Sequence, residues 1–177
     1  QDKAANAPQP KYRCLVWACP AHYYTNFTYW TQHCWGVTCV NDMEAMLSYL
    51  PITIGDKEQA LADLVRCYEK MMMRSHTNGG YVNLLDECWK MCEKFHTNIV
   101  IMYDHVSCKN VGGLHGLFED QARERGIHLI WIPHDVMDPR TVSRREMREA
   151  FSQYMVTVLN EKPLDPTLLD YEDALSW

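Results

Sequence analysis

The sequence has no long hydrophobic run, since none of its apolar stretches reaches the roughly 18 residues that a membrane-spanning helix requires. It also has no excess of basic residues: 17 Lys and Arg stand against 23 Asp and Glu, for a formal net charge of −6. A general nucleic-acid-binding protein carries a basic face that neutralises phosphates. The first ten residues contain no apolar signal core. We therefore expect a cytoplasmic protein that binds neither membranes nor nucleic acid.

Several common site motifs are absent as well. No Gly-x-Gly-x-x-Gly follows the first predicted strand, and the sequence contains neither a P-loop nor the nucleophile elbow Gly-x-Ser-x-Gly. The loop after the first predicted strand also lacks the Ser, Thr and Gly residues that would cradle a flavin phosphate. A flavin-binding protein is therefore the least favoured of the functions considered.

The chain has 177 residues, of which eight are Cys and ten are Met. Five of the cysteines fall on apolar faces of predicted helices and strands: Cys14, Cys39, Cys67, Cys88 and Cys92. Buried free thiols in a reducing compartment explain them more simply than disulfides do. Residues so easily oxidised would suit an anaerobic organism.

Apolar runs and helical stripes alternate along the chain. Strands are predicted at 14–18, 37–40, 98–103 and 127–132, and helices at 23–35, 56–72, 81–95, 114–126 and 143–158. Gly36 and Gly126 are predicted helix ends, residues 77–80 a break, and 41–55 a long loop with at most one helical turn. Asp56 with Gln59 and Ser143 with Glu146 have capping-box spacing. Alternating strands and helices predict an α/β fold with a parallel sheet and right-handed crossovers. We expect a flavodoxin-like sheet of four strands in the order 2-1-3-4, with helices on both faces.

The predicted domain covers residues 12–162, between a linker or loose N-terminus (1–11) and an acidic C-terminal tail (163–177). Because the sequence opens without Met, we expect a processed chain or a fragment of a longer one.

Ligands bind parallel sheets beyond the carboxyl ends of the strands, so the loops that follow strands are the candidate sites. The loop after the third strand carries His105, Ser107, Cys108 and Lys109 and then the pair Gly112-Gly113. Adjacent glycines let a ligand approach the backbone, and a helix begins next. A thiol beside a lysine there is a good metal ligand or nucleophile, and Cys108 is therefore the main candidate.

Other strand-end residues have two interpretations each. Cys19 is a possible second thiol, although a plain loop cysteine is the favoured interpretation. Histidines there could transfer protons, and His105 is the best placed of His22, His105, His115 and His134. Asp135 and Asp138 could bind a cation but more often cap turns. Four arginines (Arg140, Arg144, Arg145 and Arg148) could meet phosphates, although a solvated helix face is favoured.

Three segments of the second half of the chain form a combined pattern. They are Ser107-Cys108-Lys109 after an apolar strand, Asp135-Val136-Met137-Asp138-Pro139-Arg140 after the next strand, and a last helix opened by Ser143 that carries Arg148 and Phe151. With this pattern, the segment from Thr97 to about Asn160 resembles the last domain of the 2-hydroxyacyl-CoA dehydratase and benzoyl-CoA reductase family. Residues from Tyr12 to Leu61 match the preceding strand–helix–strand of that family more loosely.

The resemblance implies a two-domain, flavodoxin-type enzyme subunit that holds a [4Fe-4S] cluster between its domains, next to other subunits. It implies an acyl-CoA substrate and a separate ATP-dependent iron–sulfur activator that supplies electrons. Cys108 matches the cluster ligand of the C-terminal domain. The other cluster cysteines belong to an N-terminal domain that this sequence lacks, so another domain or chain would complete the site. We expect Ser107, Lys109, Gly112 and Gly113 to border the cofactor, and His105 and His22 to deliver protons.

Three functions remain open at this point. The aromatic residues after the first strand and the Gly112-Gly113 pair favour reduction of an aromatic acyl-CoA. Dehydration of a 2-hydroxyacyl-CoA by the same family is the first alternative. A cluster-free partner subunit that only packs against a catalytic chain is the second.

Overall fold

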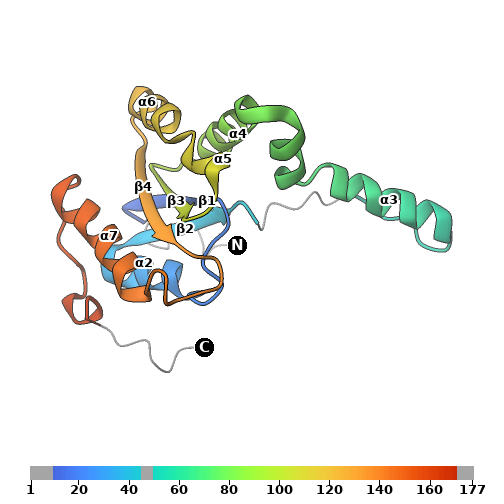
Figure 1. Cartoon of the computed structure of the whole chain (residues 1–177). Helices are drawn as coiled ribbons and strands as arrows, with labels where there is room; N and C mark the ends of the chain where they lie inside the picture. The colour runs from blue at the N-terminus through green and yellow to red at the C-terminus, as the bar shows by residue number, and fades with distance from the viewer. Residues whose placement is uncertain (1–9, 45–49, 171–177) are drawn as a thin grey trace, which may run out of the picture.

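The computed structural model describes residues 10–44 and 50–170. Four parallel strands form its sheet: β1 (Tyr12–Trp17), β2 (Val37–Asp42), β3 (Ile99–His105) and β4 (His128–His134). Their order is β2-β1-β3-β4 (Figure 1), which confirms the predicted flavodoxin-like arrangement. All four carboxyl ends therefore lie at one edge of the sheet.

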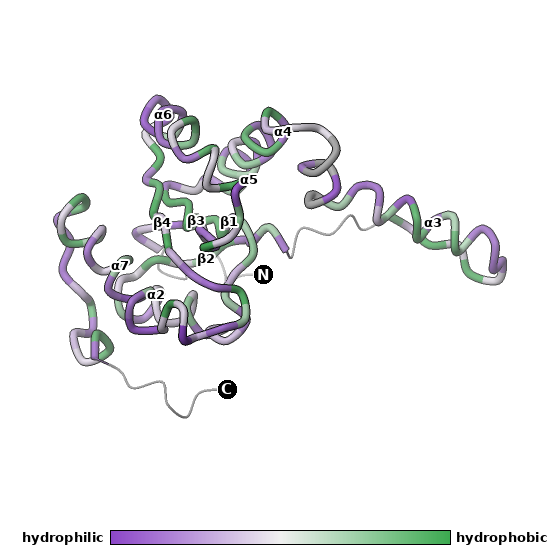
Figure 2. Tube along the Cα trace, in the orientation of Figure 1, coloured by the Kyte–Doolittle hydropathy of each residue, from purple (hydrophilic) through white to green (hydrophobic). Residues whose placement is uncertain are grey.

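The central strands are apolar throughout because both of their faces are covered. Ile99 to Tyr103 of β3 are five consecutive buried residues, and Cys14 to Trp17 of β1 are buried as well. Figure 2 shows these hydrophobic segments at the centre of the molecule. Burial on both faces of the sheet thus explains the unbroken apolar runs in the sequence.

Three strands extend further at their carboxyl ends than predicted. β2 includes Asn41 and Asp42, β3 includes Asp104 and His105, and β4 continues through Pro133 to His134. The prediction that Pro133 ends its strand is wrong. β4 is an edge strand of the described sheet, and proline is tolerated on an edge because its missing N–H has no ladder partner to satisfy there.

Helices cover both faces of the sheet, as predicted (Figure 1). On one face α2 (Phe27–Trp35) packs against α7 (Arg144–Thr157), where the rings of Phe27 and Phe151 lie 5.8 Å apart. On the other face α4 (Met72–Phe95) packs against α6 (His115–Arg125), where the rings of Trp89 and Phe118 lie 5.7 Å apart. Aromatic contacts on each face therefore fix the helices to the sheet.

The predicted helix boundaries are largely confirmed. Gly36 ends α2 with a φ of 69°, a left-handed conformation that favours glycine. Ser143 and Glu146 form the predicted capping box at the start of α7. The predicted break at 77–80 is confined to Gly80, which has a φ of 71° inside α4. Helical residues before it, from Met72 on, were not predicted as part of this helix.

The amphipathic helix α3 (Lys57–Glu69) is present, but its apolar face lies in solvent. It extends away from the sheet in Figure 1, and its larger apolar side chains are 42% to 61% exposed: Leu61, Leu64, Val65 and Tyr68. Asp56 caps the helix as predicted by accepting a hydrogen bond from the Gln59 backbone N–H. The Gln59 side chain instead donates to Asp63, so the expected capping box is not formed.

Two further predictions lie partly outside the described residues. The part of the predicted turn that falls within 45–49 lies outside the described residues, and 50–56 contains no helix. Residues 163–170 of the predicted tail lie against α2 and include the short helix η1 (Pro166–Leu168). There the Leu164 N–H donates to the Cys34 carbonyl at 2.7 Å, and Trp30 Nε1 donates to the Leu168 carbonyl at 2.9 Å. Among the described helices, none combines the length and apolar character that crossing a membrane requires.

Candidate functional site

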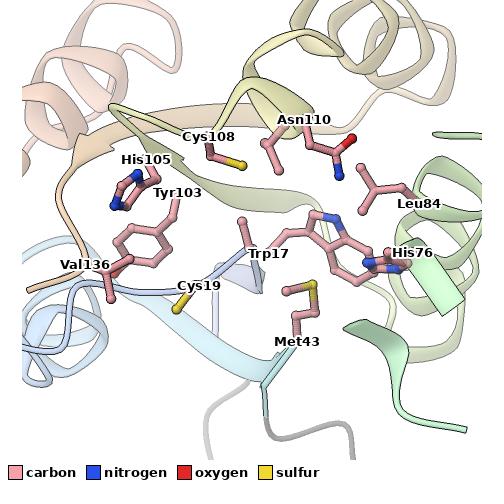
Figure 3. A pocket seen from close by; sticks show the side chains of 12 residues that line it. Trp17, Cys19, Met43, His76, Leu84, Tyr103, His105, Cys108, Asn110 and Val136 are labelled. Atoms are coloured by element: carbon pink, nitrogen blue, oxygen red, sulfur yellow. The ribbon is translucent and has the colours of Figure 1, made fainter. Parts of the chain in front are cut away.

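A cavity of about 240 Å³ lies at the carboxyl ends of the strands. Figure 3 shows side chains from β1, β3, α4 and α5 and from the loops after all four strands around it. Most of its wall is apolar or aromatic: Trp17, Ala18, Met43, Leu84, Tyr103, Val111 and Val136. Its polar groups are few, which is typical of a ligand pocket: Cys19, His76, His105, Cys108 and Asn110.

Cys108 lines this cavity and is half-buried. It is the N-cap residue of α5 (Lys109–Gly112), and its backbone N–H donates to the His105 carbonyl at 2.9 Å. This turn connects the end of β3 to the start of α5. It places Cys108 at the carboxyl ends of the strands. The strand–loop–helix sequence thus positions the predicted thiol at the site.

His105 also lines the cavity, and its environment determines which ring nitrogen carries a proton. The backbone N–H of Ser107 donates to His105 Nδ1 at 3.1 Å, and Ser107 Oγ lies 2.9 Å from the same atom. Because a backbone N–H is only a donor, Nδ1 acts as an acceptor and the neutral ring carries its proton on Nε2. Nε2 lies 4.0 Å from an Asp135 carboxylate oxygen. His105 is therefore held as a donor at Nε2.

Asp135 and Asp138 cap the turn after β4, as the favoured interpretation predicts. Asp135 accepts hydrogen bonds from the backbone N–H groups of Met137 and Asp138, both at 2.8 Å, which lower its pKa. The Arg140 guanidinium pairs with Asp138 at 2.6 Å and lowers the pKa of that carboxyl to about 2. These bonds give both aspartates a structural role.

Cys19 forms a group with two residues outside the cavity wall. Its Sγ lies 2.9 Å from Glu44 Oε1 and 3.8 Å from His22 Nε2, and His22 Nε2 lies 3.9 Å from Glu44 Oε2. Burial, followed by the hydrogen bond to Glu44, raises the pKa of the Cys19 thiol to about 12. The predicted residue His22 is exposed and faces this group rather than the cavity.

Four residues expected to border a cofactor do not line the cavity: Ser107, Lys109, Gly112 and Gly113. All four are exposed. A Cβ on Gly113 would lie 2.8 Å from the Lys109 carbonyl oxygen, so the turn itself requires glycine there. α5 has only four residues, so it offers little helix dipole to attract negative charge.

The other candidate histidines lie apart from the cavity wall. His134 is fully buried, and its ring lies 5.4 Å from that of His105 and 5.0 Å from that of Tyr103. Burial, and then the neighbouring His105, lower its pKa. His115 stacks on Trp131 at 3.4 Å on the α6 side of the sheet. The four histidines therefore do not converge.

Sequence reasoning missed the residues that shape the cavity most. Trp17 and Tyr103 lie near the carboxyl ends of the two central strands, and His76 comes from the unpredicted first part of α4. The rings of Trp17 and His76 lie 5.4 Å apart, and neither Trp17 Nε1 nor His76 Nε2 has a hydrogen-bond partner among the described residues. The position of Trp17 at the carboxyl end of a predicted strand could have indicated that it lines the site.

Two of the candidate arginines are not on a solvated face. Arg148 is 5% exposed and its Nη1 donates to Tyr24 Oη at 3.0 Å, while Arg144 Nε donates to the Tyr23 carbonyl at 2.9 Å. Arg140 and Arg145 do pair at the surface, with Asp138 and Glu149. All eight cysteines are free thiols; of the five predicted to be buried, Cys14, Cys88 and Cys92 are buried, whereas Cys39 and Cys67 are half-buried.

A family model described as 2-hydroxyglutaryl-CoA dehydratase, D-component, matches residues 1–155. The chain belongs to this family. The match confirms the resemblance carried by the loop of Cys108 and the turn of Asp135 and Asp138, and it also includes the first half of the chain, where the resemblance is looser. No individual curated protein gave a match. The cavity at the carboxyl ends of the strands is therefore the candidate functional site of this chain.

Proposed function

We propose that this chain provides one wall of the active site of an iron–sulfur enzyme that reduces an aromatic acyl-CoA. The observation that supports this most is the apolar cavity that Cys108 and His105 both line. An apolar cavity of about 150 Å³ can hold a benzene ring. At about 240 Å³ the cavity suits an aromatic acyl group, whereas the rest of CoA would have to lie outside it.

The donor set at the cavity is consistent with a [4Fe-4S] cluster bound in part by this chain. Cys108 would hold one iron through its thiolate, because thiolate sulfur is the usual ligand of such clusters. The described residues offer only Cys19 as a second thiol at the cavity, so the remaining ligands would come from another domain or subunit. When bound, the cluster supplies single electrons at low potential. A separate ATP-hydrolysing activator would deliver those electrons in the cytoplasm.

The residues of the chain itself would bind and protonate the substrate. Trp17 and Tyr103 present large aromatic surfaces that keep water from the acyl group. His105 would hold a proton at Nε2, the ring nitrogen that Ser107 leaves free to donate. His22 is exposed and does not line the cavity, so it would reach the substrate only through Cys19, whose Sγ lies 3.8 Å from His22 Nε2.

A second candidate reaction is dehydration of a 2-hydroxyacyl-CoA. It is favoured by the family description, which names a 2-hydroxyglutaryl-CoA dehydratase component. A dicarboxylic acyl group would need a cationic partner for its free carboxylate, and no Arg or Lys is among the residues that line the cavity. We therefore rank reduction of an apolar acyl group first.

The test is iron and acid-labile sulfide content of the complete enzyme assembly, purified without oxygen, beside turnover of benzoyl-CoA and of 2-hydroxyglutaryl-CoA. Roughly four irons per cluster are expected in the parent. Cys108→Ala should lose iron and turnover, while the matched control Cys67→Ser, on the remote helix α3, should keep both. Normal iron and turnover in Cys108→Ala would refute the assignment of Cys108. An iron-free copy of this chain within an otherwise active complex would support the partner-subunit alternative instead.

A further inference from the structure

The loops after β1 and β2 bring three different metal-binding side chains together. Cys19 and His22 follow β1 with the spacing Cys-x-x-His, and Glu44 follows β2. Their ligand atoms all lie within 4.8 Å of one another. The thiol, imidazole and carboxylate are the three side-chain types that bind zinc.

The distances within this group are close to, but not yet those of, one tetrahedral site. With Zn–S near 2.3 Å and Zn–N or Zn–O near 2.0–2.1 Å, ligand atoms of a tetrahedral site lie roughly 3.3–3.6 Å apart. The observed separations from His22 Nε2 are 3.8 Å to Cys19 Sγ and 3.9 Å to Glu44 Oε2. The shorter distance of 2.9 Å from Cys19 Sγ to Glu44 Oε1 is that of a thiol that donates its proton to a carboxylate. An ion would replace that shared proton.

The backbone holds the three residues in place. The His22 N–H donates to the Val136 carbonyl at 2.8 Å, and the N–H of Met43, the neighbour of Glu44, donates to the Val16 carbonyl at 3.0 Å. Ala18, next to Cys19, has a φ of 65°, a strained conformation that recurs at functional sites. The side chains of His22 and Glu44 are 51% and 41% exposed, so an ion can reach them from solvent.

We propose that Cys19, His22 and Glu44 bind a thiophilic divalent cation such as Zn²⁺, with at least one coordination position left to water. The ion joins the loops after β1 and β2 and lies beside the cavity, because Cys19 lines it. It is separate from any ligand of Cys108, which belongs to the loop after β3. The proposal therefore stands whether or not this chain contributes to an iron–sulfur cluster.

The experiment titrates the reduced, metal-free full chain with Zn²⁺ against a chromophoric chelator, and with Co²⁺ followed by absorption. Parent protein should bind one ion. Its Co²⁺ complex should show a thiolate charge-transfer band and the intense visible bands of tetrahedral cobalt. Cys19→Ser and His22→Gln should each weaken Zn²⁺ binding by at least about 100-fold, beyond the roughly 10- to 100-fold that loss of an outer-shell partner costs. Glu44→Gln should weaken it by about tenfold or more.

Two cysteine variants act as controls. Cys67→Ser removes a thiol of similar exposure on α3, and Cys108→Ala removes the other thiol of the cavity wall. Both should bind Zn²⁺ as the parent does, with unchanged circular dichroism in every variant. Failure of the parent to bind one ion, binding that survives Cys19→Ser, or binding lost in Cys108→Ala would each overturn the proposal. Because the titrated protein is first made metal-free, none of these outcomes depends on the iron content measured above.

Discussion

His105 and His134 are paired in register at the carboxyl ends of β3 and β4, with ring centroids 5.4 Å apart and ring planes nearly perpendicular at 88°. One ring lines the cavity, and the other is fully buried behind it. Two protonated imidazoles at this distance would repel each other in a poorly solvated site. Burial, and then the neighbouring His105, therefore favour the neutral form of His134 and lower its pKa.

This pair predicts a loss of stability on mild acidification. The pKa of His134 is lowered in the folded protein, first by burial and then by His105, whereas an unfolded histidine titrates near pH 6.5. Below about pH 6.5 the unfolded chain binds a proton that the folded chain excludes, so the free energy of unfolding falls as the pH falls. His134→Gln should flatten this dependence by up to about 1.4 kcal/mol per pH unit between pH 6.5 and 5.

Urea denaturation of the full chain at several pH values measures this slope. His33→Asn, at an exposed position on α2, is the matched control and should keep the parent slope. The buried His76, whose pKa burial also lowers, should leave some slope in His134→Gln. An identical slope in parent and His134→Gln would show that His134 does not set the acid limit.

His105 is expected to matter for turnover and not for iron content. His105→Gln removes the proton held at Nε2 and should lower turnover by about 10²- to 10⁴-fold, the usual contribution of a general acid. Iron content measured in the same samples should stay at the parent value. Ser107→Ala is the control, because the backbone N–H that orders His105 remains, and its turnover should stay within a few-fold of the parent. Equal losses in both variants would contradict the role of Nε2.

Truncating a side chain in the protein core should lower the free energy of unfolding much more than truncating one on the exposed apolar face of α3. Phe118 is fully buried against Trp89, and Phe118→Ala should cost about 3–5 kcal/mol of unfolding free energy. Leu64 is 42% exposed, and Leu64→Ala should change stability by less than about 0.5 kcal/mol in the isolated chain. Chemical denaturation measures both. A large loss in Leu64→Ala would mean that α3 packs against the body in solution.

The capping box of α7 predicts a smaller effect at one hydroxyl. Ser143 Oγ accepts from the Glu146 backbone N–H, and the Glu146 carboxylate accepts from the Ser143 N–H at 2.7 Å. Ser143→Ala should lower the free energy of unfolding by about 1 kcal/mol. Ser152→Ala, inside the same helix, is the control and should cost less than about 0.5 kcal/mol, since alanine favours helix. Equal effects would exclude the cap as the cause.

Local patterns in the sequence determined the elements and the parallel α/β class, and the order of the sheet followed from the flavodoxin-like fold expected for that class. The run Ile99 to Tyr103 is apolar on both faces, which requires a central parallel strand, and Gly36 and Ser143 marked helix ends through backbone chemistry that needs no distant partner. Cys108 was placed correctly at a strand end because parallel topology sends every strand end to one edge. The family of the chain was predicted from the residues around Cys108, and the family model confirms it.

Tertiary structure alone decided which side chains meet. Glu44 is adjacent to Cys19 because β2 pairs with β1, a contact between loops that no periodicity encodes. The apolar face of α3 reads like a buried face, yet it lies in solvent because nothing in the described chain packs over it. Arg148 is buried because Tyr24 from the loop before α2 reaches it across the fold. Such contacts depend on the distance between elements, and local sequence does not carry that information.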